Sequence, residues 1–398
     1  MKARTVQLGE VARIGAGQGA PQDRAAFTKE GRPFIRAASL EVLCGDGSDS
    51  TLERISEATA AKHRLRLYSP NTVVFAKSGM SATKNRIYRL RKPAYVVNHL
   101  ATVEPGEELD ATYLRYWLES LNPTRLIQDI AYPSISQEDI QAVSMSLPDL
   151  PEQQRIAGQL EQADRLRRTH RYALELSDTF LPAAFLQLFG EPAAISAGFP
   201  VETVGSLFSE ERDGAKCGPF GSALKKHEYV PEGIPVWTME NVGENEFREE
   251  GCLYITPEKF EELKAYDAQN GDILISRAGT VGRMAIVETK HPRSIIHSNI
   301  IRLSLDPSRC LPIYFVVLMT FFAHRVGRLK RGQEDAYTFM NTGRLAELRI
   351  PVPPLPLQEQ FALLVARHER LRAVQRESLR QSEHLFQSLL HHAFNTPP

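Results

Sequence analysis

The chain repeats one segment at a constant spacing, at the two points where long helices are expected to begin. Leu147–Gln154 (LPDLPEQQ) returns as Val352–Glu359 (VPPLPLQE), so that Pro151 corresponds to Pro356 and the shift is 356 − 151 = 205. The same shift continues without a gap through a helix length. It pairs Ile156 with Phe361, Leu160 with Val365, Arg167 with Arg372, Leu174 with Leu379, Ser177 with Ser382, Leu181 with Phe386, and Phe189 with Phe394. A period this long predicts a duplicated unit of one domain and one helix rather than a solenoid.

Length and composition agree with two folded halves. The 398 residues suffice for two or more hydrophobic cores, and no apolar run is long enough to span a bilayer. The first fifteen residues, MKARTVQLGEVARIG, lack the apolar stretch of a signal peptide, so we expect a cytoplasmic protein without a membrane segment. The four cysteines lie far apart without a C-x-x-C pair, which favours packing roles over a zinc site or disulfides; they are Cys44, Cys217, Cys252 and Cys310.

Charge is balanced overall but unevenly distributed. The formal net charge is zero, yet residues 58–103 contain nine Lys and Arg and no Asp or Glu. Residues 277–331 contain ten Lys and Arg against only Glu288 and Asp306. A solvated charged surface explains one such run, but a basic segment in each half also fits a nucleic-acid partner.

Local patterns predict the same plan in both halves. β-rich residues at 73–76 and 95–97 predict strands, and the apolar spacing of Ala111–Leu121 predicts an amphipathic helix. Gly271–Gly279 aligns with Asn71–Gly79 at a shift of 279 − 79 = 200, and Leu311–Phe322 stands where the first amphipathic helix stood. We therefore expect a mixed α/β (α+β) domain in each half.

Glu152–Phe189 and Leu357–Phe394 are predicted as two long helices that pack on each other. Each would extend about 57 Å at roughly 1.5 Å per residue, with proline-rich starts that fix where it begins. The apolar seam predicts a coiled coil, interrupted by polar positions such as Arg167 and His170 that either set the register or face solvent. The expected seam residues are Ile156, Leu160, Leu174, Leu181, Phe361, Val365, Leu379 and Phe386.

No catalytic or cofactor constellation is evident. The sequence has no G-x-x-x-x-G-K-[ST] loop, no Asn-Pro-Pro-aromatic tetrapeptide and no metal-ligand spacing among its histidines. Gly15–Gly19 precedes no apolar helix and is better explained as a flexible loop than as a cofactor cradle. Glu262–Lys264 has the E-x-K form of some nuclease sites, but a surface helix explains it better, and His391-His392 fits a helix end. We predict no catalytic residue, no metal and no cofactor.

Two glycine-containing basic turns follow equivalent strands and supply the side chains that a DNA reader needs. Cations neutralise phosphates, small polar side chains reach base edges, and glycine lets backbone N–H groups approach phosphate closely. We predict DNA contacts for Lys77, Ser78, Gly79, Thr83, Lys84 and Arg86 in the first half, and for Lys225, Arg277, Gly279, Thr280 and Arg283 in the second.

With these features in place, the chain resembles a specificity (S) subunit of a type I restriction-modification system over nearly its whole length. The twice-used proline-led glutamine motif is the most specific part of the resemblance. The other matching motifs are L-G-E-V-A at Leu8–Ala12, G-P-F-G-S at Gly218–Ser222, E-G-I-P at Glu232–Pro235, G-D-I-L-I-S-R-A-G at Gly271–Gly279 and P-L-P-L-Q-E-Q at Pro354–Gln360. The first half has Gly15–Gly19 where the second has Gly218–Ser222.

The resemblance implies two target-recognition domains that each read half of a split DNA sequence. It implies residues 1–147 and 191–351 as these domains, and 148–190 and 352–398 as conserved helices that pack antiparallel with pseudo-twofold symmetry. The implied partners are double-stranded DNA, two methyltransferase (M) subunits and restriction (R) subunits, and the S subunit itself is non-catalytic. Two other hypotheses remain: a stand-alone DNA-modifying or DNA-cleaving enzyme, and a coiled-coil scaffold that does not read sequence.

Overall fold

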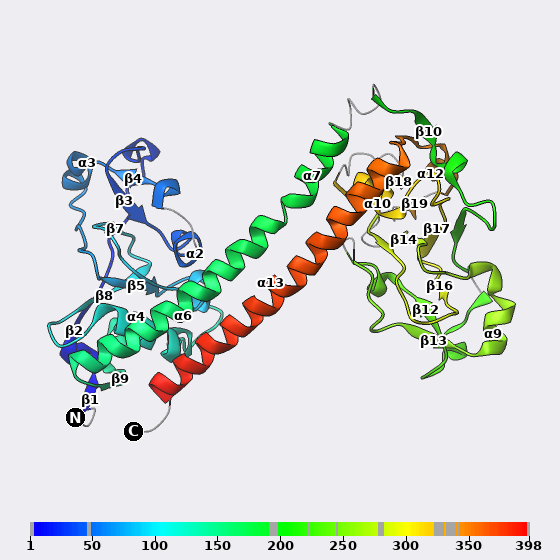
Figure 1. The fold of residues 1–398 in the computed structure, drawn as a ribbon. Helices are drawn as coiled ribbons and strands as arrows, with labels where there is room; N and C mark the ends of the chain where they lie inside the picture. Colours follow the sequence, from blue (N-terminus) through cyan, green and yellow to red (C-terminus); the bar gives the residue numbers. More distant parts are fainter. Residues whose placement is uncertain are drawn as a thin grey trace. The chain divides into compact units, whose positions relative to one another are not determined.

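The computed structural model describes residues 4–45, 49–190, 198–220, 223–243, 246–277, 282–321, 330–331, 339–340 and 342–395. The chain divides into two compact units. Unit 1 comprises residues 1–176 and 372–398, and unit 2 comprises residues 177–371 (Figure 1). Both units therefore combine residues from distant parts of the sequence.

The central sheet of unit 1 is antiparallel and has a core on each face. Its strand order is β2 (Ala12–Ala16), β8 (Leu100–Pro105), β5 (Val73–Ala76) and β6 (Ile87–Arg89). In β5, Val73 and Phe75 enter one core while Val74 and Ala76 enter the other. This alternation follows from the two-residue period of a strand, and both faces of β5 are buried because both are covered.

Smaller elements cover these two faces. A second sheet has the order β4 (Arg54–Ile55), β3 (Arg32–Ile35) and β7 (Tyr95–Val96), with β3 and β7 parallel, and β1 (Arg4–Gln7) pairs with β9 (Ser144–Leu147). The predicted strands and the helix Ala111–Leu121 are confirmed as β5, β7 and α4. The remaining helices of this part are α1 (Leu8–Val11), α2 (Ser39–Cys44), α3 (Glu57–Lys62) and α5 (Gln137–Ala142).

Unit 2 repeats the order and pairing of all these strands and adds one further pair. Its four-stranded sheet has the order β11 (Ala215–Cys217), β17 (Ile300–Leu303), β14 (Ile273–Ser276) and β15 (Met284–Ile286). Its three-stranded sheet has the order β13 (Leu253–Ile255), β12 (Ile234–Trp237) and β16 (Ile295–Ile296), again with one parallel pair. Two further strand pairs are β10 (Val201–Thr203) with β20 (Arg349–Pro351), and β18 (Lys330–Arg331) with β19 (Phe339–Met340). The helices are α9 (Pro257–Glu262), α10 (Pro312–Phe321) and α12 (Thr342–Glu347). The duplication predicted from the spacing is thus a duplication of fold.

The long helices differ from the prediction in one respect. The second is continuous as α13 (Leu355–Asn395), but the first is divided into α6 (Leu150–Ser177) and α7 (Phe180–Phe189). Pro182 explains the division, because it has no N–H to donate to the Asp178 carbonyl and its ring clashes with that group in a continuous helix. A proline is tolerated in the first turn, so a new helix begins at Phe180. The prediction of one unbroken helix over Glu152–Phe189 was wrong.

Within each unit the long helices pack antiparallel. In unit 1, Leu160 of α6 packs with Phe386 and Leu390 of α13, while farther along α6 the His170 Nδ1 atom lies 3.2 Å from the Ser382 hydroxyl. In unit 2, the rings of Phe185 on α7 and Phe361 on α13 meet edge to face at 5.5 Å. The residue number rises along one helix as it falls along the other, which is the expected antiparallel arrangement.

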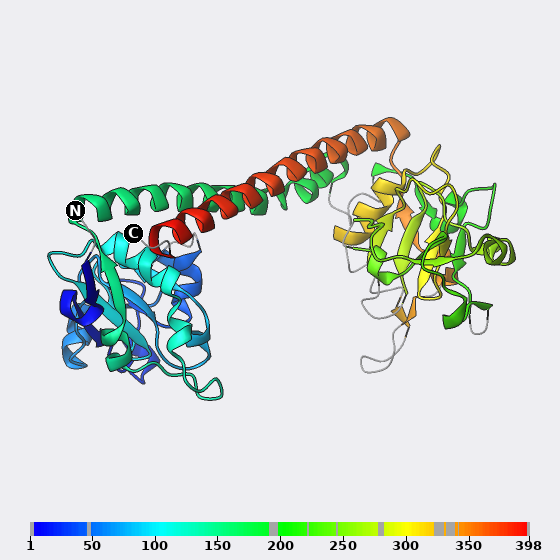
Figure 2. The same ribbon diagram turned by 90° about the horizontal axis from the view of Figure 1, so that it is seen from below.

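The predicted seam residues fall into two groups. Leu160, Phe361, Val365 and Phe386 are buried, whereas the others are half-buried, namely Ile156, Leu174, Leu181 and Leu379. The buried ones lie near helix ends, where the globular part also covers them: Tyr116 of α4 packs against Leu160 and Phe386. Figure 2 shows α6 lying along this part of unit 1. The buried seam residues therefore contact the globular part of their unit as well as the facing helix.

Candidate DNA interface

The basic turn of unit 1 is held by backbone hydrogen bonds on both sides. After β5, the Lys77 N–H donates to the His99 carbonyl at 2.9 Å, and the Lys77 carbonyl accepts from the Ile135 N–H at 2.8 Å. Gly79 donates to the Pro133 carbonyl at 2.9 Å and has φ of 73°. A Cβ at Gly79 would meet no atom within 4 Å, so the left-handed backbone rather than crowding favours glycine there.

The side chains of this turn differ in availability. Lys77 is half-exposed and Lys84 exposed, and neither forms an ion pair with any residue that the structure describes. The Arg86 guanidinium lies 2.9 Å from a Glu41 carboxylate oxygen, which offsets part of its charge. The Ser78 hydroxyl lies 2.8 Å from His99 Nδ1, and the Thr83 hydroxyl donates to the Met80 carbonyl at 2.8 Å. Lys77 and Lys84 are therefore the least engaged cations of this turn.

His99 is a member of this site that the sequence did not predict. It stands directly before β8, far from Ser78 in sequence, and only the antiparallel pairing of β5 with β8 brings the two together. Its equivalent at a shift of 200 is Asn299, whose carbonyl accepts the Arg277 N–H at 2.8 Å. The shift of 200 residues between the halves was the sequence signal that could have identified His99, because it pairs this residue with Asn299.

The turn of unit 2 begins in the same way. Arg277 follows β14, and its guanidinium carbon lies 4.6 Å from the centre of the Phe220 ring, a cation–π distance. Arg283 is exposed, and its backbone N–H donates to the Ser276 hydroxyl at 3.0 Å. Lys225 is also exposed and precedes a short 3-10 helix at Lys226–Glu228. Gly279 and Thr280 lie outside the described residues.

The two glycine loops are equivalent despite their different sequences. Gly17 donates to the Leu100 carbonyl at 3.1 Å, and Gly218 donates to the Ile300 carbonyl at 3.0 Å. A Cβ at Gly17 would lie 2.2 Å from the Val96 carbonyl oxygen, and one at Gly218 would lie 2.1 Å from that of His297. Each glycine is required by the close approach of another backbone segment. The expectation that Gly15–Gly19 is merely a flexible loop was wrong at Gly17.

The repeated glutamine of the helix-start motif has the same buried position in both units. Gln153 Nε2 donates to the carbonyls of Glu108 and Pro148 at 2.9 and 2.8 Å, and its Oε1 accepts from the Asp110 N–H at 2.8 Å. Gln358 repeats all three contacts at 2.7–3.0 Å, with the carbonyls of Arg309 and Pro353 and the N–H of Leu311. The motif ties the start of each long helix to the loop that precedes α4 or α10.

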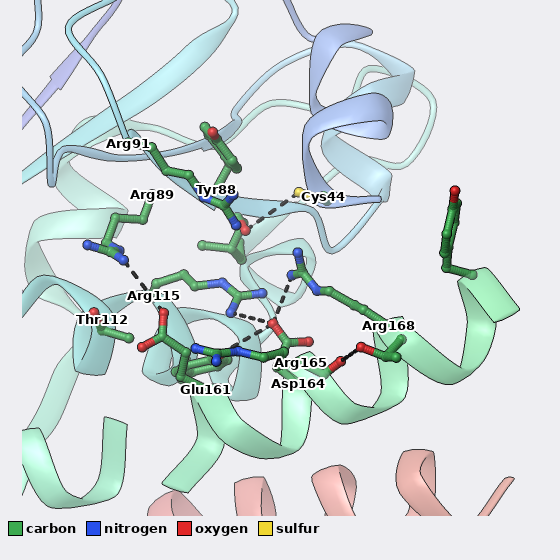
Figure 3. A pocket seen from close by; sticks show the side chains of 14 residues that line it. Cys44, Tyr88, Arg89, Arg91, Thr112, Arg115, Glu161, Asp164, Arg165 and Arg168 are labelled. Carbon is green, nitrogen blue, oxygen red and sulfur yellow. Dashed lines mark hydrogen bonds and ion pairs between the residues drawn. The ribbon is translucent and has the colours of Figure 1, made fainter. Parts of the chain in front are cut away.

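A group of charged side chains joins α4 to α6 in unit 1. Buried Asp164 lies within 3.0 Å of guanidinium nitrogens of Arg115, Arg167 and Arg168. Figure 3 shows Asp164 with Arg115 and Arg168. Burial alone would raise the pKa of Asp164, but the three guanidinium groups outweigh it and lower the pKa to about 2. The carboxylate is therefore ionised throughout the physiological range, and the group is a structural joint.

A pocket of about 770 Å³ opens beside this joint. Its lining contains five arginines, Arg89, Arg91, Arg115, Arg165 and Arg168, and the acids Glu161 and Asp164, so that the charge is 5 − 2 = +3 (Figure 3). Cys44 also lines it, but burial raises the pKa of its thiol to about 11, so it is no nucleophile at neutral pH. The pocket can attract anions but contains no acid–base pair for catalysis.

Metal-ligand clusters and membrane-spanning helices can be sought only in the part of the chain that the structure describes. These residues contain no group of three or more His, Cys, Asp or Glu side chains placed to hold a metal ion. Their helices also include none that is both long and apolar enough to cross a membrane.

Comparison with known proteins identifies the family. Residues 2–175 and 220–378 match the family described as "Type I restriction modification DNA specificity domain". The chain belongs to this family. The two matched regions cover both basic turns and most of both long helices, so the family resemblance seen in the motifs is confirmed.

Two curated relatives of this specificity-domain family come from Methanocaldococcus jannaschii. The type I restriction enzyme MjaIX specificity subunit is 26% identical over 153 residues, which cover 36% of this chain and 34% of that protein. The putative type I restriction enzyme MjaX specificity subunit is 26% identical over 144 residues, with 35% and 34% covered. The alignment thus spans about a third of each relative.

Solved structures extend the fold likeness to the whole chain. The type I restriction-modification S subunit from M. genitalium has a TM-score of 0.61 at 15% identity, with 100% of this chain and 97% of that chain covered. A second chain, from a study titled as describing assembly and conformational transition of the type I R-M system, has a TM-score of 0.56 at 16% identity, with 99% and 97% covered. The predicted mixed α/β fold with two repeats and long helices is confirmed.

Proposed function

We propose that this chain is the DNA-reading specificity subunit of a type I restriction-modification complex and recognises a split, asymmetric DNA site. The observation that carries the proposal is the same basic turn at the same place in both units. Lys77 and Arg277 each follow the inner strand of a four-stranded sheet and donate their N–H groups to residues 99 and 299. Two such turns suit two half-sites.

The side chains divide into two kinds of DNA contact. Lys77, Lys84 and Arg283 are solvent-accessible cations without an ion pair among the described residues, which suits phosphate binding. Arg277 stacked on Phe220 has a fixed planar guanidinium, which suits bidentate reading of a guanine edge. The remaining predicted contacts, including Arg86, Lys225, Gly279 and Thr280, belong to the same two loops or flank them.

We assign residues 1–147 and 191–351 to the two target-recognition domains, and residues 148–190 and 352–398 to the conserved helices. The buried glutamines Gln153 and Gln358 support this assignment, because each forms two hydrogen bonds that fix the start of its helix to a loop of its own domain. Helices attached in this way can hold two recognition domains at a set separation along DNA.

The long helices also offer surfaces for partner subunits. Leu166 and Leu176 are exposed on α6, and Val374 is exposed on the stretch of α13 in unit 1. In unit 2, Leu363 and Leu371 are exposed on the start of α13. Exposed apolar side chains at helical spacing suit docking of partner helices. One such surface per unit supports two methyltransferase subunits, with restriction subunits joining the complex.

No chemistry is assigned to the chain itself. Glu262 and Lys264 of the E-x-K sequence are both exposed, at the end of a short surface helix, and burial makes the Cys44 thiol unreactive by raising its pKa. Methylation and cleavage then belong to the partner subunits, and this chain needs no cofactor. A stand-alone enzyme would instead methylate or cleave DNA as a purified single chain.

The deciding experiment is modification mapping of genomic DNA. Cells that express this chain with its methyltransferase partner are compared with cells that lack only this chain. A split modified motif that depends on this chain supports the proposal, and exchange of residues 1–147 for those of a relative should then change one half of the motif alone. If the complex assembles but no modification depends on this chain, the scaffold hypothesis replaces it.

A further inference from the structure

The most exposed large apolar side chains of the described residues lie in two segments of unit 1. One is the basic turn, which contains Met80, and the other is the loop that contains Ile130 and Tyr132. Met80, Ile130 and Tyr132 are 71%, 79% and 82% exposed, whereas no other large apolar side chain in the described part of the chain exceeds 64%. Apolar side chains of this size normally bury part of their surface against the rest of the protein. Three of them in neighbouring loops therefore indicate a surface that binds a partner.

Backbone pairing holds these loops side by side. Ser78 and Ser134 form an antiparallel bridge, and Gly79 donates to the Pro133 carbonyl at 2.9 Å. Met80 directly follows Gly79 and begins a short 3-10 helix, and Tyr132 directly precedes Pro133, so both exposed side chains adjoin this backbone pairing. Pro133 and Ile135 are buried, so the loop that contains Ile130 and Tyr132 is anchored in the protein directly after its exposed residues. The three exposed side chains are therefore attached to a backbone that hydrogen bonds and burial hold in place.

The charges around these three side chains favour DNA over a protein partner. Met80 lies between Lys77 and Lys84 in a segment, residues 58–103, that contains no acidic residue. Asp129 is the acidic residue in the loop that contains Ile130 and Tyr132, and it already accepts a hydrogen bond from the Ala131 N–H at 2.8 Å. Apolar side chains bordered by cations match a duplex, in which stacked bases lie between two rows of phosphates.

The sequence carries a related feature in the second half. Ala131-Tyr132 returns as Ala336-Tyr337 at a shift of 337 − 132 = 205, the shift that also relates the long helices. Tyr337 lies outside the described residues, and its position in the repeat comes from the sequence. The recurrence fits a role that both halves share.

We propose that Met80, Ile130 and Tyr132 form an apolar wedge that enters between adjacent base pairs of the half-site read by unit 1. This inference rests on the proposed function. Partial unstacking of one base step by these side chains would bend the duplex toward the basic turn. Wedges of Ile, Met and similar side chains are a known means of bending DNA, and base steps that unstack easily would be preferred. The loop would then contribute to sequence selection through DNA deformability.

The test uses the assembled complex of this chain with its methyltransferase partner and the split site found by modification mapping. Duplexes carry 2-aminopurine at successive positions of the half-site, except at the methylated adenine, where the methyltransferase itself could move the base. The wild-type complex should raise fluorescence at one step. The triple variant M80S/I130S/Y132S should lose this increase and bind at least about tenfold more weakly, with an unchanged slope of affinity against salt.

The control is Leu253→Ser, which removes an exposed leucine of unit 2 and should leave the signal in this half-site unchanged. The inference is overturned if no non-target position responds in the wild-type complex, or if the triple variant keeps both the response and the affinity. Both results leave the proposed function standing, because the complex still binds its mapped site. Failure of the wild-type complex to bind any split site would instead overturn the proposed function. Since the replaced side chains are exposed, the variant should fold, and its melting curve verifies this.

Discussion

At the scale of single residues, the repeated glutamine shows why one motif appears twice. Gln153 is fully buried and forms hydrogen bonds with two backbone carbonyls and one backbone N–H. The sequence predicted that this motif starts a helix. That the glutamine also attaches the helix to its domain depends on loops more than forty residues away, which local patterns do not contain.

Replacement of this glutamine should destabilise its unit. Gln153→Leu removes three hydrogen bonds to part-buried backbone groups, each of which contributes about 1 kcal/mol or more. We expect the free energy of unfolding to fall by about 3 kcal/mol or more, measured by urea denaturation. The matched control is Gln154→Leu, on the next, exposed position of the same helix, which should change the free energy by less than about 0.5 kcal/mol. Equal effects of the two substitutions would contradict the anchoring role.

Asp164 predicts a dependence of stability on pH. Its pKa is lowered from 3.8 in the unfolded chain to about 2 in the folded one, because three arginines favour the ionised form against burial. A lowered folded pKa contributes stability above pH about 4, and this is lost as the pH falls toward 2. The contribution is on the order of 2 kcal/mol.

The measurement is the free energy of unfolding between pH 2 and 7 for the wild type and Asp164→Asn. The variant should be less stable at pH 7, and the difference should shrink as the pH falls through this window. Glu175→Gln, at an exposed position of α6, serves as the control and should follow the wild-type curve. A difference that stays constant with pH would rule out Asp164 as the titrating group.

At the scale of elements, the break between α6 and α7 comes from one proline. The equivalent position in the continuous helix α13 is Gln387, since 182 + 205 = 387. On the two sides of the break, the Ser177 carbonyl accepts a hydrogen bond from His368 Nε2 at 2.9 Å, and the His368 ring stacks on Phe180. The break was not predicted although its cause is in the sequence, because the apolar seam continues through Pro182 without a change of register.

Substitution of Pro182 by glutamine should close this break. The restored N–H can donate to the Asp178 carbonyl, so amide hydrogen exchange at residues 179–181 should slow by at least about tenfold. The reciprocal Gln387→Pro should destabilise α13 by about 3 kcal/mol or more. If exchange in the Pro182→Gln variant is unchanged, the His368–Ser177 contact rather than the proline maintains the break.

The basic turns yield a prediction about salt. Each phosphate contact contributes about 0.9 to the slope of log affinity against log salt concentration. Alanine at Lys77, Lys84, Arg86, Arg277 and Arg283 should therefore weaken binding to all duplexes and flatten this slope, measured by titration of the assembled complex. Loss of a base-reading arginine alone should cost roughly 1–3 kcal/mol and relax one base position.

Lys92→Ala is the control for the basic turns, because Lys92 lies in the same basic segment but is paired with Asp49 at 3.2 Å. Its slope should match that of the wild type within about 0.3. If the fivefold variant keeps the wild-type affinity and slope, the assignment of these turns to DNA is wrong.

At the scale of the whole molecule, the proposal makes the paired helices a spacer between half-sites. Insertion of seven residues in α6 after Tyr172, and of seven in the facing stretch of α13, preserves the heptad seam and adds about 10.5 Å. The gap between the two halves of the modified motif should lengthen by about 3 base pairs, at roughly 3.4 Å each. Modification mapping measures the gap, and an unchanged gap in an assembled complex would contradict the spacer role.

The sequence by itself determined the duplication, the strands that precede both basic turns, the amphipathic helix α4 and the place of its counterpart α10, and the family. These follow from periodicity, spacing and motif, which are local or repeated properties of the chain. The pairing of Ser78 with His99, the requirement for glycine at Gly17 and the exposure of Met80, Ile130 and Tyr132 were decided only by the tertiary structure. Each depends on which distant backbone segment lies opposite, and long-range strand pairing sets that register.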